Sequence, residues 1–184
     1  MHMATNVRYW TRDDLEHLPD DGNRYEVLNG ALLVTPPPSV DHQRIALRLA
    51  IILSEYCERY GIGWVVGPGA IVFGGNELLP DVHVIPGPYV PGRKWEQLPR
   101  AILVAEVRSD STSRRDLGNK RAAYQAERIP VYWVVDGDAR RALVWTPASA
   151  EPVTVTDTLR WQPRADIEPL EIPLDEVFPP RATN

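Results

Sequence analysis

Residues 101–107 read Ala-Ile-Leu-Val-Ala-Glu-Val, an apolar run that does not alternate with polar residues. A strand with one face in water alternates, so a run without alternation indicates a strand that is covered on both faces. A charged stretch follows, beginning with the helix-capping pattern Ser113-Arg114-Arg115-Asp116, and then a second apolar run at residues 131–135. We therefore predict a strand, a helix to about Arg128 and another strand. This order predicts an α/β fold with a mixed central β-sheet flanked by helices.

The sequence before this centre predicts further elements. Asn29-Gly30 lies between two apolar runs and is a strong signal for a β-hairpin. Ser39 is a suitable N-cap for a helix that runs to about Tyr60, with Gly61 as its terminator. Short apolar runs that are expected to form a β-meander are residues 63–66, 70–73 and 78–85. We expect these strands to join the central strands in one sheet.

Prolines indicate where the loops and edges lie. The chain has 18 prolines among 184 residues, about twice the usual share of roughly 5%. Proline lacks an amide donor, so its clusters avoid the interiors of helices and strands. We predict a single domain over residues 1–184, with extra β-hairpins in its N- and C-terminal parts. Residues 1–23 form a short helix and lead-in, and the proline-rich residues 147–184 form an extension packed on the same domain.

The composition excludes several classes of protein. No run approaches the roughly 18 consecutive apolar residues of a membrane-spanning helix, and residues 1–6 are too polar for a secretion signal. The single cysteine, Cys57, cannot form an internal disulfide, which favours the cytoplasm. With 20 basic and 25 acidic residues the net charge is -5, which excludes a uniformly basic surface that binds nucleic acid without specificity. The net charge does not exclude a local basic patch.

Three acidic residues stand out because each lies among the apolar residues of a predicted strand. They are Glu106, Asp81 and Glu26. A carboxylate in such a place costs free energy unless it meets a cation, a metal ion or a hydrogen-bond donor. A strand end that reaches solvent would explain one of them, but three on neighbouring strands indicate a site. A hard cation such as Mg²⁺ takes one or two carboxylates together with water and phosphate oxygens.

The helix after the central strand supplies basic residues. Leu117, Lys120 and Tyr124 recur in it at helical spacing, so Lys120 is predicted to face inward and to need an anionic partner. Arg108 lies on the same side of its strand as Glu106, because side chains alternate along a strand. For the arginines of this region, a solvated helix face and a phosphate-binding role both stay open.

Two histidines lie close to these predicted elements. His42 falls in the first turn of the helix that Ser39 begins. The helix dipole disfavours a protonated ring there, so a neutral His42 could accept a hydrogen bond or bind a metal, or it could simply pack. His83 has the same strand parity as Asp81 and could line the same site.

Pro80-Asp81 followed by Glu106-Val107-Arg108 resembles the pattern of PD-(D/E)xK nucleases. The surrounding sequence, from about Arg24 to the end, resembles a large bacterial family described as putative restriction endonucleases. The segments that carry this resemblance are Arg24–Gly30, Pro36–Ser39 with His42-Gln43, Val104–Ser109 with Asp116, Lys120 and Tyr124, Pro130–Asp136 and Leu170–Phe178. The resemblance implies a restriction-endonuclease-like fold.

The resemblance also implies roles for single residues. Asp81 and Glu106 match the family's metal-binding pair, which would take Mg²⁺ or Mn²⁺, with the carbonyl of Val107 as a further ligand. Lys120 matches a catalytic lysine that has moved from the strand to the helix. Glu26 matches an acidic position near the site.

This chain departs from the family at Arg108, where members commonly have an apolar residue. Arg108 occupies the lysine position of the parent motif, but a guanidinium stays protonated and cannot act as a base. Whether Arg108 or the helix lysine is the catalytic cation therefore stays open. With Arg114 and Arg115, Arg108 is expected to hold flanking phosphates. His42 and Tyr124 are candidates for accessory residues.

These observations lead to a principal hypothesis and two alternatives. The principal one is a metal-dependent endonuclease that hydrolyses phosphodiester bonds in DNA. It is expected to act as a homodimer, because two sites related by a two-fold axis suit the two strands of a duplex. The first alternative is a module that kept the fold, lost catalysis and has a nucleic-acid-binding or regulatory role. The second is an assembly protein whose exposed strands pair in a dimer, with its carboxylates in salt bridges.

Overall fold

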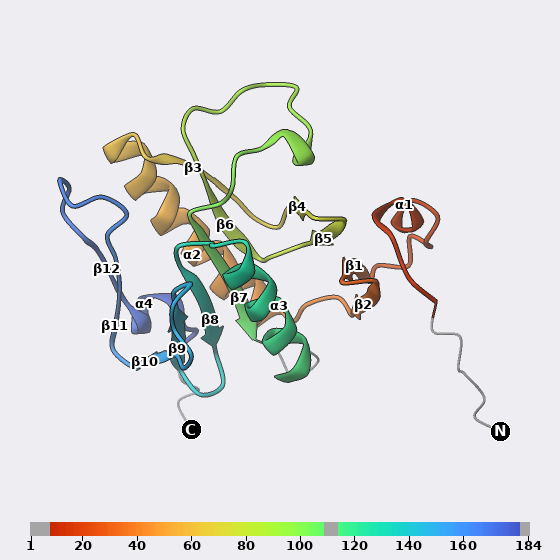
Figure 1. Cartoon of the computed structure of the whole chain (residues 1–184). Coiled ribbons are helices and arrows are strands. Elements are labelled where there is room, and N and C mark those ends of the chain that lie inside the picture. The colour runs from red at the N-terminus through yellow and green to blue at the C-terminus, as the bar shows by residue number, and fades with distance from the viewer. Residues whose placement is uncertain (1–7, 109–113, 181–184) are drawn as a thin grey trace.

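The structure, a computed structural model, describes residues 8–108 and 114–180, without the side chains of residues 114–116 (Figure 1). Its helices are α1 (Arg12–Leu15), α2 (Val40–Tyr60), the 3-10 helix η1 (Trp95–Gln97), α3 (Arg114–Ala126) and α4 (Leu174–Val177). Its strands are β1 (Arg24–Leu28), β2 (Ala31–Thr35), β3 (Gly63–Val66), β4 (Ile71–Phe73), β5 (Asn76–Leu78), β6 (Val82–Pro86), β7 (Leu103–Arg108), β8 (Tyr132–Asp136), β9 (Arg141–Trp145), β10 (Val153–Val155), β11 (Thr158–Trp161) and β12 (Leu170–Pro173).

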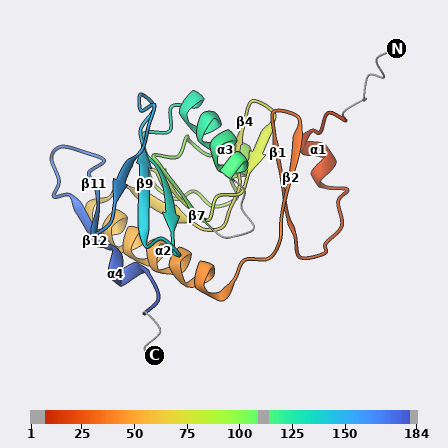
Figure 2. The ribbon, with the colours of Figure 1, turned by 90° about the horizontal axis from the view of Figure 1, so that it is seen from below.

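A six-stranded mixed sheet forms the centre of the molecule, in the order β10-β9-β8-β7-β6-β3. β7 and β8 are parallel and are connected through α3, whereas the other neighbouring strands of this sheet are antiparallel. Figure 2 shows α2 and α3 on opposite sides of the sheet. The prediction of an α/β fold with a mixed central sheet flanked by helices is therefore confirmed.

A second sheet, in the order β2-β1-β5-β4, corrects the prediction of one sheet with a β-meander. The apolar run at residues 78–85 is not one strand, because the chain leaves β5 at Leu78 and enters β6 only at Val82. Pro80 lies in the break and has no amide hydrogen to donate to a ladder. β4 and β5 therefore join the N-terminal hairpin, while β3 and β6 join the central sheet.

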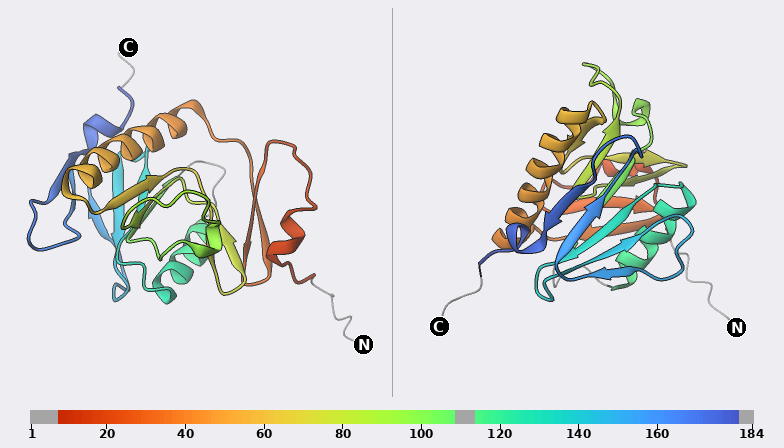
Figure 3. Two further views of the ribbon diagram at one scale, coloured as in Figure 1. Left: turned by 90° about the horizontal axis from the view of Figure 1, so that it is seen from above. Right: turned by 90° about the vertical axis from the view of Figure 1, so that its left-hand side faces the viewer.

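The two ends of the chain add smaller pieces to these sheets. Figure 3 shows α1 and the β1–β2 hairpin on one side of the molecule and the β11–β12 pair on the other. The expected N- and C-terminal hairpins are thus present, as antiparallel pairs of β1 with β2 and of β11 with β12. Within the described ranges, no helix has the length and apolar character that crossing a membrane requires.

Local signals explain why two of these elements form. The hydroxyl of Ser39 accepts a hydrogen bond from the amide of His42 at 3.2 Å and caps α2, which ends at Gly61 with a left-handed φ of 59°. Asn29 and Gly30 have φ values of 51° and 77°, the positive values that a two-residue turn of type I′ requires between β1 and β2. Both elements were predicted from these residues.

Some boundaries differ from the predicted ones. β7 begins at Leu103 rather than Ala101 and extends to Arg108, so Glu106 lies inside the strand. α3 ends at Ala126 rather than at Arg128, whose positive φ of 54° ends the helical path. Pairing with partner strands determines where a strand ends more than the apolar run does. The boundary predicted from the apolar run was therefore wrong.

The core has one part on each face of the central sheet. On the α2 face, Leu103, Ala105 and Val107 of β7 are buried against Leu49 and Leu53. On the α3 face, Val104 is buried with Tyr124 of α3 and Tyr132 of β8. β7 is apolar on both faces, as predicted, and Glu106 interrupts the face that α3 covers.

Candidate active site

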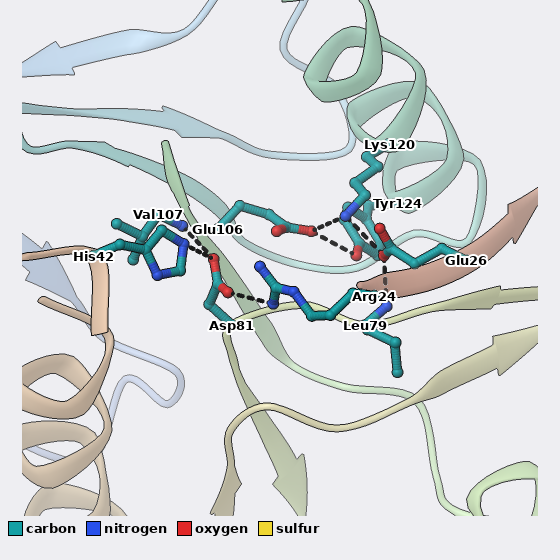
Figure 4. Close-up of polar contacts among 9 residues, drawn as sticks. All are labelled: Arg24, Glu26, His42, Leu79, Asp81, Glu106, Val107, Lys120 and Tyr124. Atoms are coloured by element: carbon teal, nitrogen blue, oxygen red, sulfur yellow. Dashed lines mark hydrogen bonds and ion pairs between the residues drawn. The ribbon is translucent and has the colours of Figure 1, made fainter. Parts of the chain in front are cut away.

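Four predicted site residues meet where the two sheets and α3 come together (Figure 4). Asp81 directly precedes β6, Glu106 lies on β7, Glu26 lies on β1 and Lys120 lies on α3. Each of the four is at most 5% exposed. Segments far apart in the chain therefore build one buried polar cluster.

Asp81 is held by three partners. Its Oδ1 accepts a hydrogen bond from NH1 of Arg24 at 2.7 Å, and its Oδ2 accepts one from the amide of Val107 at 2.8 Å. Nε2 of His42 lies 3.2 Å from the same Oδ2. The amide bond ties the carboxylate to β7, next to Glu106, although Asp81 lies outside the strand ladder.

Lys120 lies between two carboxylates. Its Nζ is 2.8 Å from Oε1 of Glu26 and 3.0 Å from Oε1 of Glu106. The hydroxyl of Tyr124, one helical turn further along α3, donates to the same Oε1 of Glu106 at 3.2 Å. The amide of Leu79 donates to Oε1 of Glu26 at 2.7 Å. The inward orientation predicted for Lys120 from its stripe on α3 is what the structure has.

Burial and charge act differently on the two carboxylates near the sheet centre. Burial, together with the negative charges of Asp81 and Glu26, raises the pKa of Glu106 to about 7, against the opposing effect of Lys120. For Asp81, burial acts upward, but His42 and Arg24 outweigh it and lower the pKa. Of these two carboxylates, Asp81 is therefore ionised at neutral pH, whereas Glu106 gains or loses its proton near neutral pH.

Lys120 stays protonated in this environment. Burial alone would lower the pKa of its ammonium, but the adjacent Glu106 and Glu26 raise it above the usual range. The phenol of Tyr124 has a pKa well above its usual value because it is buried and next to Glu106. Both groups are therefore hydrogen-bond donors rather than proton acceptors at neutral pH.

The charges of the cluster leave room for a further cation. Asp81, Glu106 and Glu26 face two cationic side chains, Arg24 and Lys120, so one negative charge is in excess when all are ionised. In the part of the chain that the structure describes, no group of three or more His, Cys, Asp or Glu side chains is arranged to hold a metal ion, so an ion here would have at most two protein carboxylates. Two carboxylates with hard oxygen atoms suit Mg²⁺ or Mn²⁺, which complete their shell with water or phosphate. The residues thus fit a hard divalent ion rather than a zinc-type site.

Arg108 does not join this cluster. Its NH1 donates to Oδ2 of Asp136 at 2.5 Å, on the neighbouring strand β8. The cation that contacts Glu106 is Lys120. The side chains of Arg114 and Arg115 lie outside the described residues.

Arg24 is the site residue that the sequence reasoning missed. It lies two residues before Glu26 on β1, so both side chains leave the strand on the same side. This parity was a usable signal, but the contact of Arg24 with Asp81 depends on how the two sheets meet.

His83, by contrast, is fully buried and both of its ring nitrogens are without a hydrogen-bond partner among the described residues. It therefore belongs to the core next to the site.

Comparisons with known proteins identify the family and the fold of the chain. The model of the Uma2 family, described as putative restriction endonuclease, matches residues 12–175. Among solved structures, the chain is similar to a putative nuclease belonging to DUF820 from Anabaena variabilis, with a TM-score of 0.75 at 16% sequence identity. That match covers 92% of this chain and 97% of the other. At this identity it establishes the shared fold. A search of curated proteins gives no significant match.

Proposed function

Since the chain belongs to the Uma2 family of putative restriction endonucleases, we propose that it is a metal-dependent endonuclease that hydrolyses phosphodiester bonds in DNA. One observation carries the proposal. The ammonium of Lys120 is fixed between Glu26 and Glu106, next to Asp81, at the junction of three elements. Such a buried set of carboxylates around one lysine is costly for folding and is expected where chemistry needs it.

Asp81 and Glu106 are the side chains that would hold Mg²⁺ or Mn²⁺, with the carbonyl of Val107 as a further ligand implied by the family pattern. When bound, such an ion neutralises phosphate charge and lowers the pKa of a water molecule. Both hydrogen bonds that Glu106 accepts from the described residues go to Oε1. Its Oε2 is the oxygen better placed to accept a new partner. Arg24 and His42 would orient Asp81 for the same purpose.

Lys120 would act as a fixed positive charge. Its raised pKa keeps the proton on Nζ, so it would donate hydrogen bonds to the attacking water or to the charge that builds on the phosphate. Glu26 would position this ammonium, and Tyr124 would position the carboxylate of Glu106. Arg108 lies two residues after Glu106 and is held by its hydrogen bond to Asp136. It would bind a flanking phosphate, as would Arg114 and Arg115.

The proposal includes a homodimer. On α2, Val40, Leu47 and Ile51 are 83%, 62% and 39% exposed, and their spacing places them on one stripe of the helix. We expect sedimentation equilibrium to give the mass of a dimer for the wild type and of a monomer for Leu47→Glu. Val153→Glu, on β10, is a control at a site of 65% exposure. A monomer for the wild type at tens of micromolar contradicts the dimer.

The alternative of an inactive module also has an observation behind it. Asp81 and Glu26 already have ion-pair partners within the chain, Arg24 and Lys120. A closed network of this kind can hold two sheets together without any reaction. The two functions differ in whether a divalent ion binds and whether DNA is cut.

The test combines a calorimetric titration with a cleavage assay. Mn²⁺ and Mg²⁺ are titrated into the wild type, Glu106→Gln and, as a matched control, Glu151→Gln, which changes an exposed glutamate in a loop. We expect saturable binding in the wild type and the control, and none in Glu106→Gln. Cleavage of single-stranded, branched and duplex DNA should show the same pattern. Neither binding nor cleavage in the wild type, with DNA present in the cell, would favour the inactive module.

A further inference from the structure

An open pocket of about 450 Å³ lies beside the candidate active site. Its apolar lining comes from Leu117, Val134, Leu143 and Trp145, and its cationic lining from Arg108, Arg121 and Arg141. We call it the arginine pocket. α3 forms one wall of it, and β8 and β9 form its floor.

Strand pairing places the arginine pocket relative to Glu106. Glu106 of β7 lies opposite Val134 of β8, which lies opposite Leu143 of β9. Residues directly opposite each other point to the same face of a sheet, and neighbouring strands are about 4.8 Å apart. The floor of the pocket therefore begins one strand away from Glu106 and extends to about 10 Å from it. That is the distance range of the next nucleotide along a nucleic-acid strand.

The next row of paired residues lines the pocket with charge. Arg108 lies opposite Asp136, and Asp136 lies opposite Arg141. Oδ2 of Asp136 accepts the hydrogen bond from Arg108 and is 4.0 Å from Nε of Arg141. On the wall, NH1 of Arg121 donates to the carbonyl of Ala150 at 3.0 Å. One buried carboxylate thus holds the guanidinium of Arg108 by a hydrogen bond and lies near that of Arg141, and with Arg121 on the wall positive charge is in excess.

The polar groups that line the pocket are hydrogen-bond donors, namely the N–H groups of arginine and tryptophan side chains. Nε of Arg121, Nε of Arg141 and Nε1 of Trp145 are buried and lack hydrogen-bond partners within residues 8–108 and 114–180. The side chains of Arg108 and Arg141 are 35% and 41% exposed, so a ligand in the pocket can reach these two guanidinium groups and supply acceptors to them. Guanidinium groups bind phosphate in bidentate fashion, and the apolar floor suits a flat ring. A nucleotide combines these two properties.

We propose that the arginine pocket binds one unpaired nucleotide of the substrate, next to the phosphodiester that is cut. The proposal rests on the proposed nuclease function and specifies its substrate. The volume lies within the range of about 300–1,000 Å³ that pockets for small ligands have. A base inside a duplex is paired and stacked on both faces, so it cannot enter such a pocket unless it leaves the stack. The protein therefore prefers DNA with unpaired nucleotides over a fully paired duplex.

Gly118 offers a variant that closes the pocket without breaking the fold. Gly118 lines the pocket, and a Cβ added to it meets nothing within 4 Å. Leucine is also a better helix former than glycine, so Gly118→Leu should keep α3 intact while its side chain fills part of the pocket. It keeps all three arginines, so it separates a shaped pocket from plain attraction between charges.

The experiment measures binding by fluorescence anisotropy in metal-free buffer with EDTA. The probes are a labelled single-stranded decanucleotide and a blunt hairpin duplex of the same total charge. We expect the wild type to bind the single strand at least about tenfold more tightly than the duplex, the size of one charge-assisted hydrogen bond. Gly118→Leu and Arg141→Gln should each weaken single-strand binding by about tenfold or more. Arg160→Gln, at an exposed position on β11, is the matched control and should bind like the wild type.

Equal affinity for the two probes, or wild-type affinity in Gly118→Leu, overturns the proposal. Because no metal is present and no bond is cut, the result does not depend on catalysis. The expected binding pattern without cleavage in Mg²⁺ would keep the pocket and reject the nuclease. Cleavage without that pattern would keep the nuclease and reject the pocket.

Discussion

At the scale of single residues, Lys120 is the group on which the candidate site depends. It contacts Glu26 of one sheet and Glu106 of the other and is itself almost fully buried. Burying these charges is expensive, and the cost is offset only while all three remain together. The same ammonium would therefore serve stability and catalysis at once.

Replacing this lysine should destabilise the protein strongly. In Lys120→Met, Glu26 and Glu106 remain buried without their shared cation, and the expected loss is about 3–5 kcal/mol in the free energy of unfolding. Chemical denaturation measures it. The chain's other lysine, Lys94, is exposed, so Lys94→Met should change the free energy of unfolding by less than about 0.5 kcal/mol. A loss below about 1 kcal/mol in Lys120→Met would contradict the role of Lys120 in holding the sheets together.

His83 is predicted to make the fold sensitive to acid. Burial lowers the pKa of its ring to about 4, whereas an unfolded histidine titrates near about 6.5. Between these values the unfolded chain binds a proton that the folded chain does not, so stability falls as the pH decreases from about 6.5 toward 4. Above about pH 6.5 the ring is neutral in both states and has no such effect.

Thermal unfolding at about pH 7.5 and pH 5 in metal-free buffer measures this component. The decrease in Tm between the two pH values should be smaller in His83→Leu than in the wild type. In His17→Leu, the control at an exposed histidine, the decrease should equal that of the wild type. Identical decreases in the wild type and His83→Leu would show that His83 titrates normally in the folded state.

At the scale of secondary-structure elements, the first turn of α2 connects capping to the site. Ser39 caps the helix through the amide of His42, whose ring lies against Asp81. An element whose boundary was predictable from a single serine thus carries one side of the candidate site. The capping bond therefore has an effect beyond the helix itself.

The same substitution at the N-cap and in the middle of α2 should have different effects on stability. Ser39→Ala removes the cap and should lower the free energy of unfolding by about 1 kcal/mol. Ser54→Ala, in the middle of the same helix, replaces a residue of moderate helix propensity by the best helix former and should be neutral or stabilising. Urea denaturation of the two variants tests this, and equal losses in both would show that the Ser39 hydroxyl does not act as a cap.

Elements also show where reasoning from the sequence succeeded and where it could not. The hairpin at Asn29-Gly30, the helix after Ser39 and the strand around Glu106 follow from local chemistry and periodicity, and they were predicted. The division of residues 78–85 between two sheets was not, because one apolar run can serve two ladders and local pattern does not say which. The contact of Arg24 with Asp81 was missed for the same reason, since it depends on the meeting of the sheets.

At the scale of the whole molecule, the candidate site lies at the junction of the two sheets. Glu26 comes from the N-terminal sheet, Glu106 from the central sheet and Lys120 from the helix between β7 and β8. A ligand bound there touches parts that separate on unfolding. Binding at the site should therefore stabilise the entire fold and not one loop.

A divalent ion is accordingly predicted to raise the unfolding temperature. If Mn²⁺ binds the folded chain alone, a concentration of 100 times Kd adds about 2.7 kcal/mol to the free energy of unfolding. Differential scanning fluorimetry should show a Tm that increases with Mn²⁺ in the wild type and Glu151→Gln but not in Glu106→Gln. A Tm that is independent of Mn²⁺ in all three proteins would speak against a metal site at these carboxylates.

The wide separation in sequence of Glu26 and Lys120 has a consequence for the newly made protein. At a translation rate of about 5–20 residues per second, the ribosome finishes Glu26 on the order of 5 to 20 seconds before it adds Lys120. During that interval β2 and then α2 are synthesised and can form, but the glutamate that will be buried does not yet have Lys120 to pair with. The nascent chain is therefore obliged to leave the inter-sheet junction hydrated until α3 emerges. Any activity at this junction is withheld during synthesis and begins only after the last of its contributors has left the exit tunnel.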